Sequence, residues 1–277
     1  MLLVGAALSA GLVTVCWARA EEVFSTGKVL SKTIPHDSGT PIRKLYHDSN
    51  IALVLRRGQD EPYVVWEVDE GWAQKIERPV VIVRPRYTTI QGRASDKEKE
   101  LICAPEMTCV NRLVITTASL EDIVQLFEGG AVTSDDTWEL QRLWIIARSQ
   151  LPVAPVDIGV KAAMVIVNAA HGGVRVRGEA EGLYLGVIDS TEDVQFVWDT
   201  TELRAKKVVV PLPFERVDLR VNVESVLEVY PPSNARSGEE PTGKVGYKGT
   251  PKLVTPYSAE GYGEKIYQIS EKKWTPD

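Results

Sequence analysis

The chain has 277 residues, of which 44% are hydrophobic and 25% are charged, and its 32 basic and 38 acidic side chains give a formal net charge of -6. This composition supplies enough apolar material for a folded core, in one large domain or two small ones. The acidic balance and the lack of any run of Lys or Arg argue against a nucleic-acid partner, because phosphate binding needs a concentrated basic face.

The most informative stretch is the N-terminus, where residues 2–18 carry no charged side chain. A helix of this length is about 25 Å long, at the short end of what spans a bilayer core of about 30 Å. Gly5, Ser9 and Gly11 belong to small-xxx-small pairs of the kind that pack transmembrane helices. We therefore expect residues 1–20 to form an N-terminal membrane anchor, and a cleaved signal peptide is the alternative.

Two cysteines outside this segment help to indicate on which side of the membrane the soluble body lies. Cys103 and Cys109 flank a proline-containing turn between apolar runs, so they can form a disulfide across a hairpin, as an exported chain permits. Two buried free thiols are the alternative. The positive charges after the apolar segment point weakly to a cytoplasmic body. We place the soluble body on the exported, periplasmic side, with secretion or the cytoplasmic face of the membrane as alternatives.

Residues 21–117 are predicted to form a first β region. Their apolar residues come in short runs rich in Val, Ile, Tyr and Trp, separated by Gly, Pro and Asp, which is typical of strands. The expected strands cover residues 51–55, 63–68, 80–83, 87–90 and 113–117.

Residues 118–150 are predicted to form a helical segment with two short helices. The first begins at Ser119, which starts a sequence resembling a capping box, and ends at a Gly-Gly pair. The second follows an aspartate cap and carries Leu140, Leu143 and Trp144 on one face, as a core-facing helix does.

Residues 151–230 are predicted to form a second, sandwich-like β region. Stretches such as 174–177 and 217–223 alternate cleanly between apolar and polar residues, which implies one buried and one solvated face. Many short strands with turns between them are typical of a sandwich or a small barrel. The predicted fold class is therefore mainly β: β-sandwich or small-barrel regions with two short helices between them, plus a single N-terminal transmembrane helix.

Residues 231–277 are rich in Pro, Gly, Ser and Lys and poor in apolar runs, so they are not expected to fold alone. Aromatic residues nevertheless recur along them. We hypothesise an extended C-terminal arm that binds a partner through its aromatic side chains, and a tail folded back on its own domain is the alternative. The arm's candidate partner-binding residues are Tyr247, Tyr257, Tyr262, Tyr267 and Trp274.

The stretch PHDSGTPIRKLYHDSN (residues 35–50) holds two His-Asp-Ser sequences but is not expected to be catalytic. A nucleophilic site needs its base oriented by a third group, which neighbours in sequence do poorly, and no Gly-x-Ser-x-Gly elbow surrounds either serine. We predict turns at His36 and His47, and a hairpin turn at His171. No catalytic residue, metal site or cofactor is predicted.

Two functions remain open. The first is a non-enzymatic, membrane-anchored structural or accessory subunit of a larger membrane complex, for example a photosynthetic or respiratory one. Its partners would be other membrane-protein subunits, together with the bilayer through the N-terminal helix. The alternative is a secreted carbohydrate- or ligand-binding β-sandwich, in which exposed Trp66, Trp72 or Trp198 would stack on sugar. A hydrolase built on a histidine ranks third.

Overall fold

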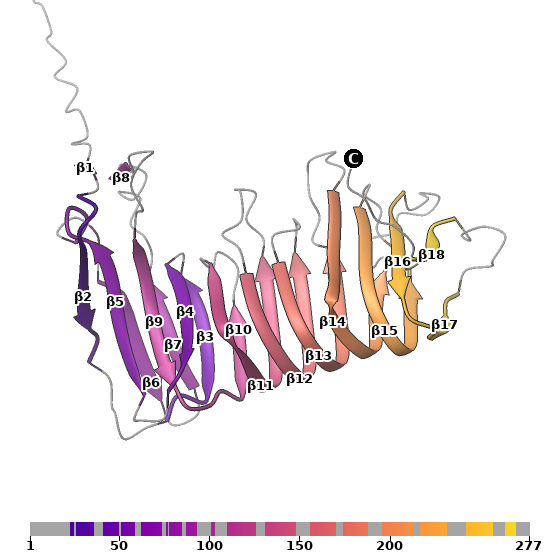
Figure 1. The fold of residues 1–277 in the computed structure, drawn as a ribbon, viewed down its shortest axis with the longest axis horizontal. Coiled ribbons are helices and arrows are strands. Elements are labelled where there is room, and N and C mark those ends of the chain that lie inside the picture. The colour runs from indigo at the N-terminus through magenta and orange to yellow at the C-terminus, as the bar shows by residue number, and fades with distance from the viewer. Residues whose placement is uncertain are drawn as a thin grey trace, which may run out of the picture.

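The computed structural model describes residues 23–24, 26–35, 41–49, 51–58, 62–73, 76, 78–84, 87–92, 101–102, 110–125, 131–147, 156–169, 174–187, 196–212, 217–231, 242–256 and 264–269. Within these segments the regular structure consists of strands alone (Figure 1). The strands are β1 (Val23–Phe24), β2 (Val29–Thr33), β3 (Lys44–Ser49), β4 (Ala52–Arg57), β5 (Tyr63–Asp69), β6 (Val80–Arg84), β7 (Tyr87–Gly92), β8 (Leu101–Ile102), β9 (Asn111–Thr117), β10 (Asp122–Gln125), β11 (Val132–Ala147), β12 (Val156–Ala169), β13 (Val174–Val187), β14 (Phe196–Pro211), β15 (Val217–Tyr230), β16 (Lys244–Lys248), β17 (Lys252–Val254) and β18 (Ile266–Gln268).

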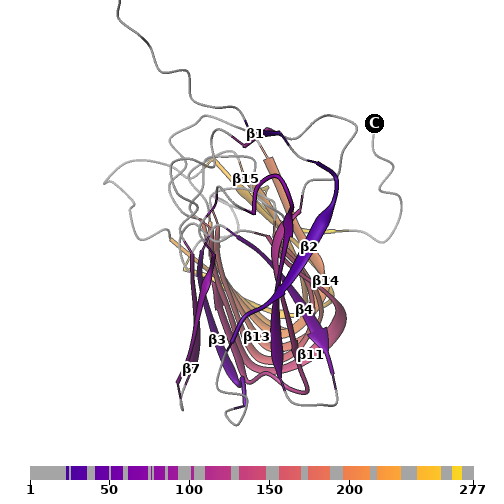
Figure 2. The same ribbon diagram turned by 90° about the vertical axis from the view of Figure 1, so that its left-hand side faces the viewer.

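The chain forms a parallel β-solenoid of about four turns. Each of the long strands β11 to β15 runs down one side of the molecule, bends, and returns up the other side (Figures 1 and 2). We call the half before the bend the first leg, the half after it the second leg, and one such pair of halves a rung. Successive rungs pair in parallel along both legs, so the two legs form facing sheets around a common core.

The bend has a simple cause in the sequence. In β12, Ala162 and Val165 are both buried, whereas the two residues between them, Ala163 and Met164, are both exposed. Strict alternation would turn one of these two inward, so the extra outward residue makes the strand fold around the core. In the ladder between β12 and β13, Ala162 accordingly pairs with Ala180 and Met164 pairs with Gly182, and the register passes over Ala163.

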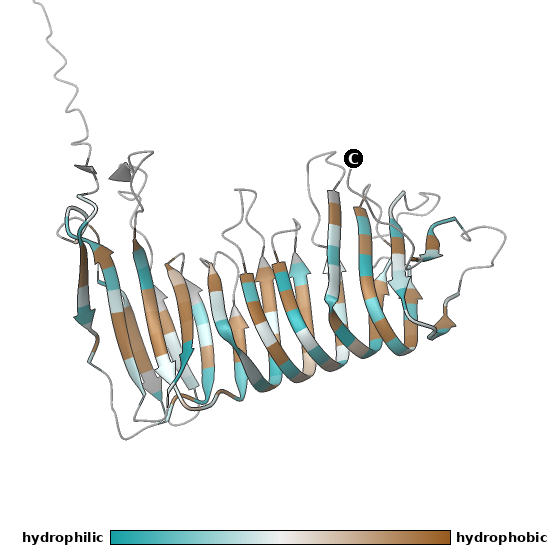
Figure 3. Cartoon of the chain, viewed as in Figure 1, coloured by the Kyte–Doolittle hydropathy of each residue, from teal (hydrophilic) through white to brown (hydrophobic). Residues whose placement is uncertain are grey.

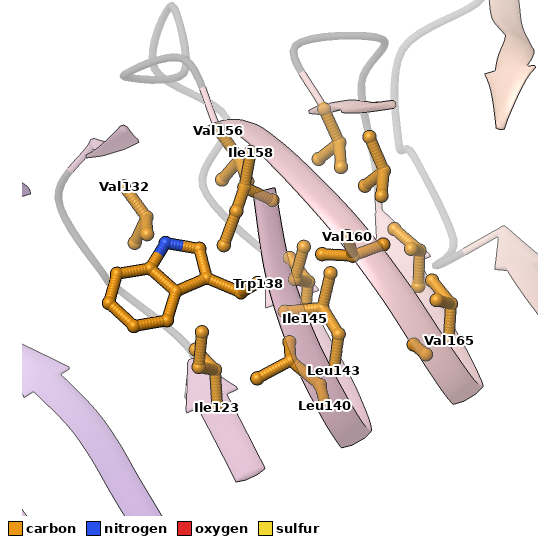
Figure 4. Close-up of a cluster of buried hydrophobic side chains, with 14 of the residues drawn as sticks. Ile123, Val132, Trp138, Leu140, Leu143, Ile145, Val156, Ile158, Val160 and Val165 are labelled. Atoms are coloured by element: carbon orange, nitrogen blue, oxygen red, sulfur yellow. The ribbon is translucent and has the colours of Figure 1, made fainter. Parts of the chain in front are cut away.

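The core between the legs is built from ladders of inward side chains (Figure 3 shows the alternation of hydropathy along the long strands). One ladder on the second leg is fully buried and consists of Leu45, Ile123, Leu143, Val165, Leu183, Val208 and Leu227. Figure 4 shows part of this core, where Trp138 packs among aliphatic side chains from neighbouring strands. The Trp138 indole donates a 2.8 Å hydrogen bond to Ser134 Oγ, so its polar atom is satisfied in the interior.

The strands at the N-terminal end build the first rungs in an interleaved order. β4 pairs with the first leg of β11, and β10 pairs with its second leg. β9 in turn pairs with β4, and β3 with β10. Antiparallel strands close this end: β5 pairs with β9, β2 with β5, and β6 with β7. Segments far apart in sequence therefore alternate in space.

The two helices predicted within residues 118–150 are wrong. Residues 122–125 form β10 and residues 132–147 form the long strand β11. Leu140 and Leu143 have helical spacing only because the bend places two outward residues between them. A bent strand thus produced the three-residue spacing that the sequence analysis assigned to a helix.

The predicted β-sandwich or small barrel is also wrong, although the mainly β class is confirmed. The sandwich expected from sequence is antiparallel, whereas β11 to β15 pair in parallel, rung on rung. Alternation reveals which side chains are buried, but it does not reveal which strand is the neighbour. The same pattern therefore fits both arrangements, and the long strands β13 and β15 were predicted only as shorter pieces such as 174–177 and 217–223.

The single-pass transmembrane helix in the predicted fold class is not upheld either. Among the described residues, no helix has the length and apolar character needed to cross a membrane. Residues 1–20, on which that prediction rested, lie outside the described residues, as do Gly5, Ser9 and Gly11.

Candidate functional site

The outer face of the second leg carries a continuous row of apolar and aromatic side chains. Outward residues alternate with the buried ladder, and those of successive rungs stand opposite one another. Because neighbouring rungs are about 4.8 Å apart, rings on every second rung are about 10 Å apart along the solenoid. This aromatic row consists of Tyr46, Val124, Trp144, Ile166, Tyr184 and Val209.

Close contacts order the N-terminal end of the aromatic row. The rings of Tyr46 and Tyr87 meet edge to face, with centroids 5.4 Å apart. Val124, which lies between Tyr46 and Trp144 in the ladder, is only 2% exposed. The Arg142 guanidinium lies 6.0 Å from the centre of the Trp144 ring. Aromatic and cation-π contacts of this kind fix the rings in place, so this part of the face is preformed.

Tyr184 occupies a different setting, because glycines flank it on the same face. A Cβ atom at Gly182 would lie 3.2 Å from Cε2 of Tyr184, so the ring extends over that glycine. A Cβ atom at Gly186 would overlap the Asn168 amide, so this amide extends over the second glycine. Tyr184 is 37% exposed. The two glycines therefore leave room for an aromatic ring and an amide to lie along the sheet, open to solvent.

A second outward row runs beside the aromatic row, two residues earlier in each strand. Lys44 Nζ lies 3.3 Å and Arg142 Nη2 3.4 Å from the same oxygen, Oδ2 of Asp122. One carboxylate thus serves two cations, and the row keeps excess positive charge in a chain of net charge -6. This basic row consists of Lys44, Asp122, Arg142, Met164, Gly182 and Lys207.

An exposed ion pair completes the surroundings of Tyr184. Lys207 stands opposite Gly182 in the ladder, and its Nζ lies 2.8 Å from Oε1 of Glu228. The hydrogen bond to Glu228 raises the pKa of the Lys207 ammonium above its ordinary value, so this group is charged at neutral pH. Tyr184 is therefore bordered by an amide, a cation and a carboxylate, which can donate and accept hydrogen bonds.

His47, the described histidine of the two His-Asp-Ser sequences, is not placed for catalysis. It lies in β3 rather than in the predicted turn, and its side chain is 0% exposed. Its Nε2 lies 2.9 Å from the carbonyl oxygen of Ile51, and burial lowers its pKa to about 4. His47 is therefore a neutral core residue that hydrogen-bonds the crossover between β3 and β4. His36 and His171 lie outside the described residues.

The three tryptophans proposed to stack on sugar are in the interior. Trp66, Trp72 and Trp198 are 2%, 8% and 1% exposed. Trp66 Nε1 donates to Asn111 Oδ1 at 3.0 Å, and Trp198 Nε1 donates to the carbonyl of Val174. Sugar stacking through these side chains is excluded by their burial.

The predicted C-terminal arm is described in part, and that part continues the solenoid. β16 pairs with the first leg of β15, β17 with its second leg, and β18 with β16. Tyr247 packs against the core, and the Tyr267 hydroxyl donates to the Asp218 carboxylate at 2.7 Å. The other predicted arm residues, Tyr257, Tyr262 and Trp274, and the predicted disulfide residues, Cys103 and Cys109, lie outside the described residues.

A hollow of about 380 Å³ lies on the outside of the bend. Glu121, Glu139, Glu181 and Lys161 supply its charged lining. The part of the chain that the structure describes contains no group of three or more His, Cys, Asp or Glu placed to hold a metal ion. The hollow combines charges without an aromatic platform, so the outer face of the second leg is the better candidate site.

Sequence reasoning missed the aromatic row because its members come from different strands. Trp144 was assigned to the buried face of a helix, although it lies outward on β11. Tyr184 fell in a predicted strand, where the sequence Gly-Leu-Tyr-Leu-Gly marks an outward aromatic between two inward leucines. That local signal was available from sequence, but the alignment of Tyr184 with Trp144 and Tyr46 depends on the register.

Comparisons with known proteins agree with the fold. No family model matches the chain, and no curated protein matches its sequence. A candidate adhesin from Bacteroides fragilis is similar in structure, with a TM-score of 0.59 and 15% identity over 89% of this chain and 100% of that one. A candidate adhesin from Parabacteroides distasonis is similar with a TM-score of 0.52 and 13% identity, over 90% of this chain and 100% of that one. At these identities the similarity shows a shared fold.

Proposed function

We propose that the protein is an exported, non-enzymatic ligand-binding protein of the adhesin type, which presents the outer face of its second leg to a ligand outside the cell. The observation that carries this proposal is the aromatic row. Large apolar side chains that remain on an outer surface are typical of binding faces, and the exposed Tyr184 combines an apolar ring with a polar hydroxyl suited to such a face.

Three further features support the proposal. The structurally similar proteins are themselves described as candidate adhesins. The uncharged segment of residues 2–18 is suited to export, as a signal peptide is. His47 is buried and neutral, so it is not available to act on a substrate. Of the two functions considered from sequence, the similarity to candidate adhesins favours the ligand-binding alternative over a subunit of a membrane complex, and the burial of His47 argues against the hydrolase.

Binding of the purified full chain to immobilised extracellular polymers tests the proposal. A panel of mucin, collagen, dextran and polygalacturonate is expected to include at least one polymer that the protein binds saturably. Replacing Tyr184, the most exposed aromatic side chain of the row, by threonine should weaken that binding. Tyr63→Thr is the matched control, because Tyr63 is 47% exposed at the start of β5, which pairs with β9 on the first leg.

Two outcomes would contradict the proposed function. One is the absence of saturable binding to every polymer of the panel. The other is an equal loss of binding in the Tyr184→Thr and Tyr63→Thr variants, because the face would then have no special part in recognition. Fractionation of cells that express the full chain tests export separately: the protein should be recovered outside the cytoplasm.

A further inference from the structure

We infer that the outer face of the second leg binds an extended acidic polysaccharide, with the ring of Tyr184 as a stacking platform for one sugar unit. This inference rests on the proposed function and deepens it by naming the ligand class. It depends on three features of the face: the spacing of the aromatic rings, the groups around Tyr184, and the charge of the basic row.

The spacing of the rings fits a linear polymer. Tyr46, Trp144 and Tyr184 stand on every second rung of one straight row, about 10 Å apart along the axis, given a rung spacing of about 4.8 Å. Aliphatic residues fill the rungs between them, so the row has no polar interruption from Tyr46 to Val209. An extended chain of repeating units laid along the solenoid would meet an aromatic ring at regular intervals.

The surroundings of Tyr184 fit a sugar ring. A pyranose has an apolar C–H face that packs on an aromatic ring, and hydroxyls at its rim that need donors and acceptors. Gly182 and Gly186 leave the Tyr184 ring and the Asn168 amide lying along the sheet. The amide both donates and accepts hydrogen bonds, and the ion pair of Lys207 with Glu228 lies on the neighbouring rungs. The face thus offers both an aromatic ring on which a sugar can stack and polar groups that can hydrogen-bond the sugar hydroxyls.

The charge of the basic row selects an acidic polymer. Lys44 and Arg142 share the single carboxylate of Asp122, which leaves positive charge beside the aromatic row. The side chains of Lys44 and Arg142 are 41% and 36% exposed, so a ligand carboxylate can reach them. The whole chain is acidic, with a net charge of -6, so a positive strip on this face is a local feature and complements a uronate-containing chain.

Affinity electrophoresis or calorimetry of the full chain with polygalacturonate tests this inference, and dextran serves as the neutral probe. Polygalacturonate should bind, and dextran should bind at least tenfold more weakly. Tyr184→Thr should lower the affinity for polygalacturonate about tenfold, the order expected for loss of one ring contact. Tyr63→Thr should leave the affinity unchanged.

A charge variant tests the role of the basic row. Arg142→Gln should weaken polygalacturonate binding and reduce its dependence on salt concentration, because one ionic contact is lost. Arg175→Gln, which removes a cation from the outer face of the first leg, should do neither. Circular dichroism and the melting temperature of each variant verify that the fold is retained.

The possible failures are distinguishable. If collagen binds in a Tyr184-dependent manner but polygalacturonate does not, the ligand class is overturned and the proposed function stands. Equal binding of dextran and polygalacturonate would overturn the acidic character of the ligand. Binding to phosphatidylglycerol vesicles without binding to polygalacturonate would replace the polysaccharide by a lipid surface. If none of these probes binds, both proposals fall.

Discussion

The two legs of the solenoid share strands and core but differ on the outside. On the first leg, Arg175 lies 2.7 Å from Glu202 and 3.4 Å from Asp157, and Arg177 lies 2.9 Å from the same aspartate. The cations on the first leg thus form ion pairs with carboxylates on adjacent rungs. On the second leg, outward positions carry an aromatic row beside a basic row that exceeds its carboxylates. The fold constrains the inward residues of both legs, whereas the outward residues are free to differ.

This difference separates the residues that stabilise the fold from the residues that are available on the surface to bind a ligand. Exposed ion pairs contribute little to stability, because water and salt screen them and the long side chains lose entropy when they pair. The inward ladders contribute most, since each removes a large apolar side chain from water. Substitutions should therefore fall into two groups: inward ones that disrupt both legs, and outward ones that alter one face alone.

The largest effect is expected from Leu183→Ala. Leu183 is 1% exposed in the shared core ladder and neighbours Tyr184 in sequence. The loss of transfer energy and the resulting cavity should lower the free energy of unfolding by about 3 to 4 kcal/mol. Urea denaturation measures this. Tyr184→Thr, one residue away but outward, should change stability by less than about 0.5 kcal/mol, and equal losses at the two positions would remove the distinction between inward and outward residues.

Acidification should destabilise the crossover between the legs through His47. Because its pKa is lowered from 6.5 to about 4 in the folded state, only the unfolded chain takes up this proton as the pH falls below 6.5. Stability is thus unaffected by this group above pH 6.5 and is lost progressively down to pH 4, by about 3 kcal/mol in total.

Denaturation midpoints at pH 7 and pH 4.5 measure this loss. In His47→Gln the difference between the two midpoints should shrink, even though the variant is less stable at both pH values. An unchanged difference would show that other groups govern the acid sensitivity.

A substitution in the first leg, Gly178→Ala, should cost about 1 to 3 kcal/mol, the range of a strained backbone position. Gly178 has φ 112°, and a Cβ atom there would overlap the carbonyl oxygen of Val160. Thermal unfolding detects the loss. Gly182→Ala is the comparison, because its Cβ would come within 3.2 Å of the Tyr184 ring but would make only an ordinary contact, at 3.8 Å, with the backbone carbonyl oxygen of Ala163. That variant should keep most of its stability and bind polygalacturonate more weakly, and the opposite ranking of the two glycines would contradict the geometry.

The smallest effect is expected from Arg175→Gln on the outer face of the first leg. Arg175 and Glu202 are 56% and 49% exposed, so their ion pair is well screened. The denaturation midpoint and the affinity for polygalacturonate should both be indistinguishable from those of the original protein. A drop in polygalacturonate affinity would assign ligand binding to both legs and end the contrast drawn between them.

The sequence allowed the mainly β class to be predicted, because runs of Val, Ile and Tyr have strand lengths and strand composition. It did not allow the parallel stacking to be predicted, since no local signal states which strand is a neighbour. The bend gives Leu140 and Leu143 the same spacing in sequence as two residues on one face of a helix. Trp66 and Trp198 could be taken for binding residues from sequence, because their burial depends on the fold. The aromatic row was inaccessible for the same reason as the stacking: its residues meet only through the register.

The bend also bears on how such a protein can change over evolutionary time. Each turn adds one residue to the aromatic row and one to the basic row, and it contacts only the turns before and after it. Duplication or deletion of a turn would lengthen or shorten the outer face by a fixed step, while the ends of the molecule stay as they are. The length of ligand that the face can cover is thus a property that whole-turn insertions can adjust without redesign of the core.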